Sequence, residues 1–272
     1  MNARTEPSQQ EAAPPRPSLV RELLLVAGFF LVYKTGRQLA AGHTAEAFRN
    51  ADRLWDLERA VDLPREGVVQ HLLLHGDALV RAANTYYATV HFPATLAFLV
   101  WLYLRRPAHY VWARRVLTAV TGAALLLHLA FPLAPPRMLA ATGLLDTARL
   151  YGPSVYGPPQ SDQLSNQFAA MPSLHFGWAL MVALGLIAVT RSRWRVLWLL
   201  HPALTLLVIV GTANHYWLDA LAATALLGLA LALLPRPGRT ATTAGRGAGR
   251  LLPAPRRGEA AGRDAVLVGA GR

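Results

Sequence analysis

The chain has 272 residues, of which 53% are hydrophobic and only 15% charged, and its 27 Lys and Arg against 15 Asp and Glu give a formal net charge of +12. Soluble domains usually carry about 25% charged residues, so this composition argues against disorder and against an ordinary soluble enzyme. The absence of cysteine excludes disulfides, thiolate metal sites and a cysteine nucleophile. The basic excess indicates either a nucleic-acid partner or a membrane protein with one basic side.

Six apolar segments of about membrane length predict an all-α fold, a bundle of six transmembrane helices. They cover residues 19–40, 84–104, 116–133, 168–190, 196–213 and 215–234. The first segment is the least regular, because Arg21 and Lys34 must reach the two interfaces for it to span. A cleaved signal peptide is the alternative for it, although the acidic, proline-rich residues before it do not resemble a short basic leader.

Arginines gather in the connections 105–115 and 191–195 and in the segment 235–272. All three lie on one side if six spans alternate, and the positive-inside rule makes that side the cytoplasm, together with both termini. The charge excess is then a signal of orientation in a multi-pass protein of the cell membrane. No nucleic-acid partner is expected, because basic residues are not interleaved with aromatics on one face.

The two long segments on the outer side differ in character. Segment 35–83 has apolar residues at helical spacing and is predicted to form one or two amphipathic helices between the first two spans. Segment 134–167 is rich in Pro, Gly and Tyr and predicts a loop that caps the outer end. The tails 1–18 and 235–272, on either side of the membrane domain 19–234, are predicted to be disordered.

A few ionisable residues fall within or beside the spans, where a charged group at the helix centre costs roughly 2.5–3.5 kcal/mol and therefore indicates function. His215 and Asp219 are one helical turn apart, so the carboxylate can orient the imidazole; the alternative is that Asp219 only caps the helix. The segments before and after the turn 191–195 would be about 22 and 27 Å long as helices, so His175 and His215 are expected at a similar depth in the membrane. Arg137 follows the outward end of the third span.

These residue types together favour chemistry at phosphorus. Arginine offers planar donors to phosphate oxygens, one histidine backed by a carboxylate can attack phosphorus, and a second can protonate the departing oxygen. A zinc site built from histidine and carboxylate ligands is the alternative, but Arg137 nearby opposes a cation.

Three motifs resemble those of the type 2 phosphatidic acid phosphatase superfamily of membrane phosphoesterases. They are Pro135-Pro136-Arg137-Met138, Pro172-Ser173-Leu174-His175 and His215-Tyr216-Trp217-Leu218-Asp219. The chain departs from the phosphatases at Leu174, where they have Gly, at Ile209, where they have Arg, and at Ala130, where they have Lys. These departures are similar to the inositolphosphotransferase branch, which includes fungal inositol phosphorylceramide synthase, and the resemblance covers roughly residues 50–235.

The resemblance implies a role for each matching residue. His215 would be the nucleophile that forms a phosphohistidine, Asp219 its orienter and His175 the general acid, with neither metal nor other cofactor. The substrate-binding residues would be Arg137, Ser173, Asn84, Tyr87 and His91. For the last three, which share one helical face, a polar seam between helices is an equally open interpretation.

The resemblance also implies the partners. The substrate would be a lipid phosphate held at the extracytoplasmic interface, and the acceptor either water or a polyol.

A phosphatase acting on phosphatidic acid or on polyprenyl phosphate or pyrophosphate is the main alternative to an inositolphosphotransferase-like enzyme. A lipid-binding membrane protein without activity is a further one, whereas a transporter is disfavoured because the ionisable residues gather at one interface. The oligomeric state stays open.

Overall fold

The computed structural model describes residues 16–40, 43–153 and 167–237. Most of the two predicted tails and residues 154–166 of the predicted capping loop therefore lie outside the described residues. Within the described ranges every element is helical, and the one β-type contact is an isolated bridge between Leu133 and Ala169. The predicted all-α class is confirmed for this part of the chain.

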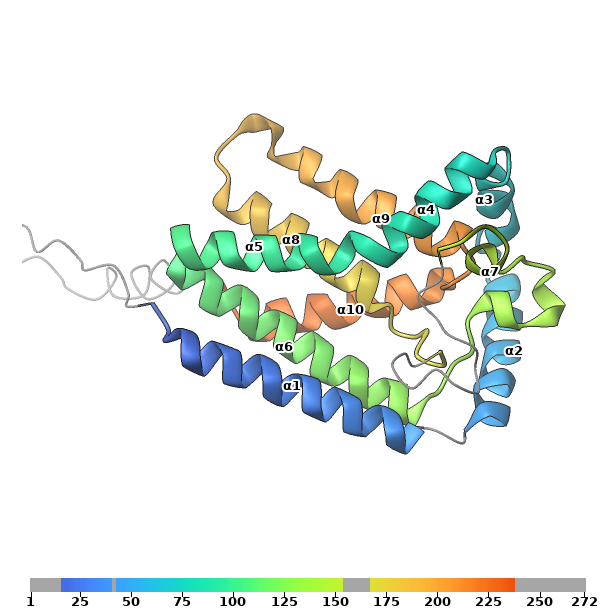
Figure 1. Cartoon of the computed structure of the whole chain (residues 1–272), viewed down its shortest axis with the longest axis horizontal. Helices are drawn as coiled ribbons and strands as arrows, with labels where there is room; N and C mark the ends of the chain where they lie inside the picture. The colour runs from blue at the N-terminus through green and yellow to red at the C-terminus, as the bar shows by residue number, and fades with distance from the viewer. Residues whose placement is uncertain (1–15, 41–42, 154–166, 238–272) are drawn as a thin grey trace, which may run out of the picture. The chain divides into compact units, whose positions relative to one another are not determined.

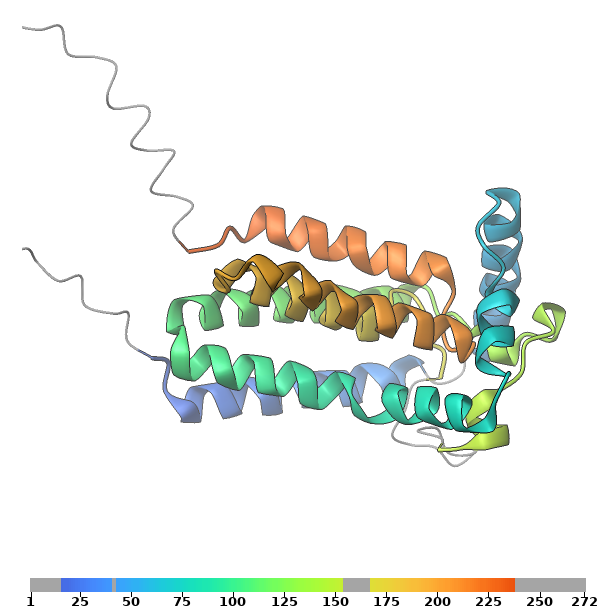
Figure 2. The same ribbon diagram turned by 90° about the horizontal axis from the view of Figure 1, so that it is seen from above.

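Six helical segments run in the same general direction and pack side by side (Figures 1 and 2). They are α1 (Leu19–Ala40), α5 (His91–Arg105), α6 (Pro107–Ala130), α8 (Leu174–Val189), α9 (Leu200–Gly211), which follows the 3-10 helix η3 (Arg193–Leu199), and α10 (Trp217–Leu233). Each overlaps one of the six predicted apolar segments. The largest core cluster contains buried residues of α5, α6, α8 and α10, among them Phe98, Val116, Met181 and Leu227.

Length and apolarity together select fewer spans than six. Among the described residues, α6 and the η3–α9 segment are long and apolar enough to cross a membrane. A third candidate is the pair of α4 (Asp77–Thr89) and α5, which is bent by 46° between them. Helices α8 and α10 are apolar but have only 16 and 17 residues.

The predicted amphipathic outer region forms α2 (Thr44–Ala60), α3 (Glu66–Leu73) and the first part of α4. Helix α2 stands across the ends of the parallel helices (Figure 2). Its buried residues recur at spacings of three and four: Ala47, Asn50, Ala51, Leu54 and Glu58. Asn50 donates to the carbonyl oxygen of Pro132 at 2.9 Å, which ties α2 to the segment after α6.

The predicted capping loop contains three short helical elements within its described residues. They are η1 (Pro136–Met138), η2 (Ala140–Thr142) and α7 (Thr147–Tyr151). Gln70 of α3 joins this loop to α9, since its side-chain amide donates to Leu145 O at 3.0 Å and to Gly211 O at 3.3 Å. The outer helices, the loop and the end of α9 therefore form one packed layer.

Candidate active site

A tight turn between α9 and α10 positions His215. Ala213 adopts a left-handed conformation with φ of +54°, which costs a non-glycine residue roughly 1–2 kcal/mol. The amides of Asn214 and His215 both donate to Ile209 O, at 3.0 and 3.1 Å. Ala213 O in turn accepts from the amide of Arg137 at 2.9 Å, so the turn and η1 are joined directly.

The imidazole of His215 is held through one nitrogen. Its Nδ1 lies 2.9 Å from Ala170 O and 3.1 Å from Asp219 Oδ2. Because both neighbours are acceptors, Nδ1 carries the proton and Nε2 keeps its lone pair. Among the described residues, hydrogen-bond partners of this ring lie at Nδ1 and not at Nε2.

Asp219 has two tasks at the start of α10. Its Oδ2 accepts from the Tyr216 amide at 2.9 Å as well as contacting His215. An acid at the third helical position that reaches back to the preceding amide is a helix cap. The capping contact and the orienting contact are therefore present together in one fully buried carboxylate.

His175 is the second residue of α8, which begins after Ser173. The Ser173 hydroxyl accepts from the Phe176 amide at 3.4 Å, and the Ser173 amide donates to Asp219 O at 3.1 Å. These contacts bring the first turns of α8 and α10 together. As a result, the ring centroids of His175 and His215 are 5.9 Å apart.

Tyr87 and His91 flank His175 from either side of the bend between α4 and α5. The ring of Tyr87 stacks on His175 with centroids 4.4 Å apart and an interplanar angle of 20°. The ring of His91 lies 4.3 Å from His175. His91 Nδ1 is buried and has no hydrogen-bond partner among the described residues.

Asn84 lies on the same face of α4 but is engaged elsewhere. Its amide group donates to Thr147 O and Gly152 O, both at 3.0 Å, and its Oδ1 accepts from Thr147 Oγ1 at 2.9 Å. In the described structure Asn84 therefore anchors α7 and the residues after it. It does not join the rings of His91, His175 and His215, which together form the histidine cluster.

Arg137 is carried by η1, and its side chain is only 3% exposed. Its Nε lies 3.5 Å from Asp146 Oδ2, and its charge is close enough to act electrostatically on His215. Four of the predicted site residues, His215, Asp219, His175 and Arg137, are thus gathered at one end of the helices. Ser173 is beside them, with its hydroxyl used as a helix cap.

Sequence reasoning missed Glu58 as part of this site. Its Oε1 accepts from the Leu218 amide in the first turn of α10 at 2.8 Å, and its side chain is completely buried. Burial, and then the neighbouring Glu66 carboxyl, raise the pKa of Glu58 to about 9. The one feature of the sequence that could have indicated Glu58 is its position, as an acidic residue, on the face of α2 that carries Ala47, Ala51 and Leu54.

Glu66 is also fully buried and accepts from Arg59 Nη2 at 3.0 Å. Glu58 Oε2 accepts no hydrogen bond, although Arg59 Nη2 lies 3.7 Å away, and a neutral Glu58 can donate a proton toward Glu66. A neutral carboxyl beside an ion pair therefore supports the N-terminus of α10. Among residues of known placement, no group of three or more His, Asp or Glu forms a candidate metal centre.

A sequence model of the PAP2 superfamily matches residues 52–233. The match covers well over half of the 272 residues and includes all of the residues described above around His215. The chain therefore belongs to the PAP2 superfamily, whose members are generally phosphatases or phosphotransferases acting on lipid phosphates. No curated protein and no solved structure matches the chain.

Together with the apolar helices, this membership indicates a membrane enzyme. Helix α1 lies outside the matched residues.

Proposed function

We propose that this protein is a membrane phosphotransferase that acts on lipid phosphodiesters through a phosphohistidine, similar to inositolphosphotransferases. The observation that carries the proposal is the environment of His215. With Nδ1–H held by Asp219 Oδ2 and Ala170 O, Nε2 retains the lone pair that a nucleophile requires. His175 and Arg137 supply a proton donor and a phosphate ligand on the same end of the helices.

In the first step, His215 Nε2 attacks phosphorus, an N–P bond forms, and the P–O bond to the departing alcohol breaks. His175 donates its proton to that oxygen. In the second step, an acceptor hydroxyl loses its proton to His175 and attacks phosphorus, and the N–P bond breaks. The Asp219 carboxylate stabilises the positive charge that His215 gains as the N–P bond forms.

The charges that the site offers support the proposed substrate class. Ile209, where the related phosphatases have Arg, is 1% exposed and packs in a hydrophobic cluster. A phosphate monoester carries close to two negative charges, whereas a diester carries one. A site with fewer cations therefore favours a diester, and transfer to a polyol over hydrolysis to free phosphate.

The proposed topology has six spans formed by α1, α4 with α5, α6, α8, η3 with α9, and α10. Exposed leucines support lipid contact by α9, since Leu200, Leu204 and Leu207 recur at spacings of four and three and are 64, 49 and 50% exposed. Helices α8 and α10 would be about 24–26 Å long, slightly less than the roughly 30 Å hydrocarbon core. Both termini would be cytoplasmic and His215 would face the outside.

The test uses purified protein and lipid phosphodiesters labelled in the head group. The unchanged protein is expected to transfer the labelled group to an added polyol and to yield an acid-labile, alkali-stable phosphoprotein. His215→Ala should abolish both signals, and His175→Ala should slow turnover strongly. His71→Ala, a change at an exposed position on α3, is the matched control.

Full turnover by His215→Ala would overturn the mechanism. Release of inorganic phosphate from phosphatidic acid, with no transfer of the head group to the polyol, would support the phosphatase alternative.

A further inference from the structure

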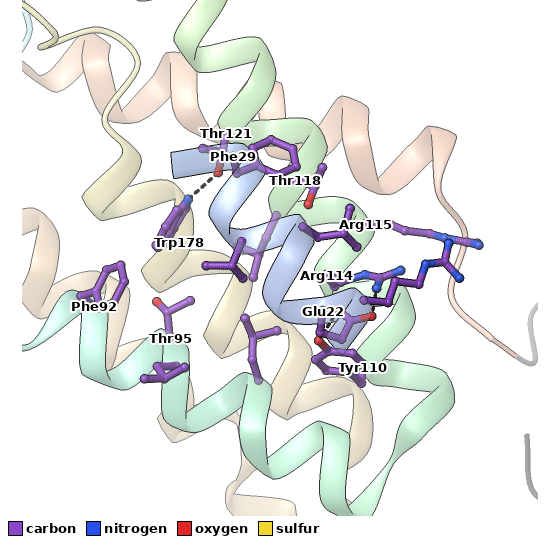
Figure 3. Close-up of a pocket in the computed structure, with 16 residues that line it drawn as sticks. Glu22, Phe29, Phe92, Thr95, Tyr110, Arg114, Arg115, Thr118, Thr121 and Trp178 are labelled. Atoms are coloured by element: carbon purple, nitrogen blue, oxygen red, sulfur yellow. Dashed lines mark hydrogen bonds and ion pairs between the residues drawn. The ribbon is translucent and has the colours of Figure 1, made fainter. Parts of the chain in front are cut away.

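An apolar pocket of about 430 Å³ lies between α1 on one side and α5, α6 and α8 on the other (Figure 3). Its volume falls within the range of roughly 300–1,000 Å³ that is usual for small-molecule sites. The lining is mostly hydrocarbon, for example Leu25, Phe29, Leu96, Leu99 and Leu117. Such a lining offers few hydrogen bonds and suits an apolar ligand.

One end of the pocket approaches the histidine cluster. Trp178 and Phe92 form this end, and Trp178 Nε1 donates to Thr121 Oγ1 at 3.0 Å (Figure 3). The ring of Trp178 lies 5.0 Å from His91, whose ring lies 4.3 Å from His175. Two ring contacts therefore connect the pocket wall with the proposed general acid.

The other end is lined by polar side chains, three of which contact one another. Tyr110 donates to Glu22 Oε2 at 2.6 Å, and Arg114 forms an ion pair with Glu22 Oε1 (Figure 3). From Tyr110 to Thr121, the pocket extends along α6 for about 16 Å. It is thus elongated, with the histidine cluster beyond one end and a polar floor at the other.

Helix α1 supplies one wall of this pocket, although it lies outside the residues matched by the superfamily model. Among the α1 side chains that the structure describes, Glu22 alone is buried. Helix α1 therefore covers the other helices loosely, and its apolar side chains, such as Val26 and Phe29, face a space that they do not fill.

We propose that this pocket binds one hydrocarbon chain of the lipid whose phosphate group reacts at His215, and that the contact of Glu22 with Tyr110 and Arg114 limits the chain length. This inference rests on the proposed function, because the phosphate at His215 fixes where the chain begins. The chain would pass Trp178 and lie along α6, with its end at the polar floor. Substrate selection would then depend on α1 as well as on the histidine cluster.

The first experiment fills the pocket. Thr118 lines it from the exposed side of α6, so Thr118→Trp occupies the space without entering the core. We expect KM for a long-chain lipid phosphodiester to rise about tenfold, because chain burial is lost, while kcat/KM for a short-chain form with the same head group stays unchanged. Ala119→Trp, at an exposed position that does not line the pocket, is the matched control and should change neither value.

Equal losses for both chain lengths, or no loss for either, would overturn the proposal.

The second experiment does not depend on whether a pocket variant folds. The unchanged protein and His215→Ala are photolabelled with a lipid phosphodiester that bears a diazirine at its chain end. Labelled peptides should come from α1 and α6 near Glu22 and Tyr110. If the unchanged protein turns over the lipid without such labelling, the pocket does not bind the hydrocarbon chain, while the proposed reaction stands. If the pocket is labelled but the lipid is not turned over, the proposed reaction is wrong, while the pocket still binds the chain.

Discussion

A single carboxylate at position 219 combines a structural and a chemical task. Oδ2 of Asp219 caps the amide of Tyr216 and accepts from Nδ1–H of His215. An asparagine retains a carbonyl oxygen for the cap but has no negative charge to stabilise a positively charged imidazole. The two tasks can therefore be separated by substitution.

We expect Asp219→Asn to lower kcat roughly 10²-fold or more, while the melting temperature changes little. Asp219→Ala should lose activity and, in addition, about 1 kcal/mol of stability, since the cap is removed. Head-group transfer and thermal unfolding in detergent measure the two effects. Unchanged kcat in Asp219→Asn would show that Asp219 is only a cap.

Glu58 makes stability depend on pH. Its pKa is raised from 4.5 to about 9, so between these values the folded protein holds a proton that the unfolded chain releases. Stability from this group is therefore complete below about pH 4.5 and decreases as the pH rises toward 9, by at most about 1.4 kcal/mol per pH unit.

Glu58→Gln, which cannot ionise, should weaken this decrease, so that the melting temperature falls less between pH 5 and 9 than in the unchanged protein. Asp56→Asn, at an exposed position on the same helix, is the control and should keep the decrease seen in the unchanged protein. An identical slope in Glu58→Gln and in the unchanged protein would show that Glu58 is ionised throughout.

At the scale of the elements, α2 ends in a Schellman motif. The amide of Leu63 donates to Glu58 O at 3.0 Å and that of Asp62 to Arg59 O at 3.3 Å, with Asp62 at a φ of +53°. Glycine adopts this conformation without strain and removes a negative charge from the C-terminal end of the helix dipole. Asp62→Gly should therefore raise stability by about 1 kcal/mol, whereas Asp62→Val should lower it, as thermal unfolding can measure.

Helices α5 and α8 approach closely at Gly185. A Cβ at this position would overlap the ring of Phe98, which is part of the main core. We expect Gly185→Ala to cost about 1–3 kcal/mol, because the ring must leave its place in a packed core. Gly228→Ala on α10, where a Cβ meets nothing within 4 Å, should be neutral or slightly stabilising. Equal melting temperatures for the two variants would contradict this contact.

At the scale of the whole molecule, the proposed six spans place α3 and the start of η3 on opposite sides of the membrane. The chain has no cysteine, so a single introduced cysteine is the only thiol that a maleimide can label. In sealed vesicles of known orientation, His71→Cys should react with an impermeant maleimide from outside and Arg193→Cys only after the inner face is opened. Both positions are exposed, and reaction of both from one side would exclude this topology.

Much of the helical order could be predicted from the sequence alone, because hydropathy and helical spacing are properties of neighbouring residues. The segment 19–40 coincides with α1, and the spacing of His215 and Asp219 correctly indicated that they meet. The histidine motifs also indicated the superfamily that the sequence match then confirmed.

Only the tertiary structure decided which distant residues complete the site. Glu58 contacts Leu218 across 160 positions of sequence, and Asn84 is held by the loop around Thr147. The left-handed Ala213 and the pocket beneath α1 likewise depend on how the helices pack. Local pattern sets where helices form and at which end a residue lies, but it does not specify the contacts between helices, which arise when the apolar faces are buried together.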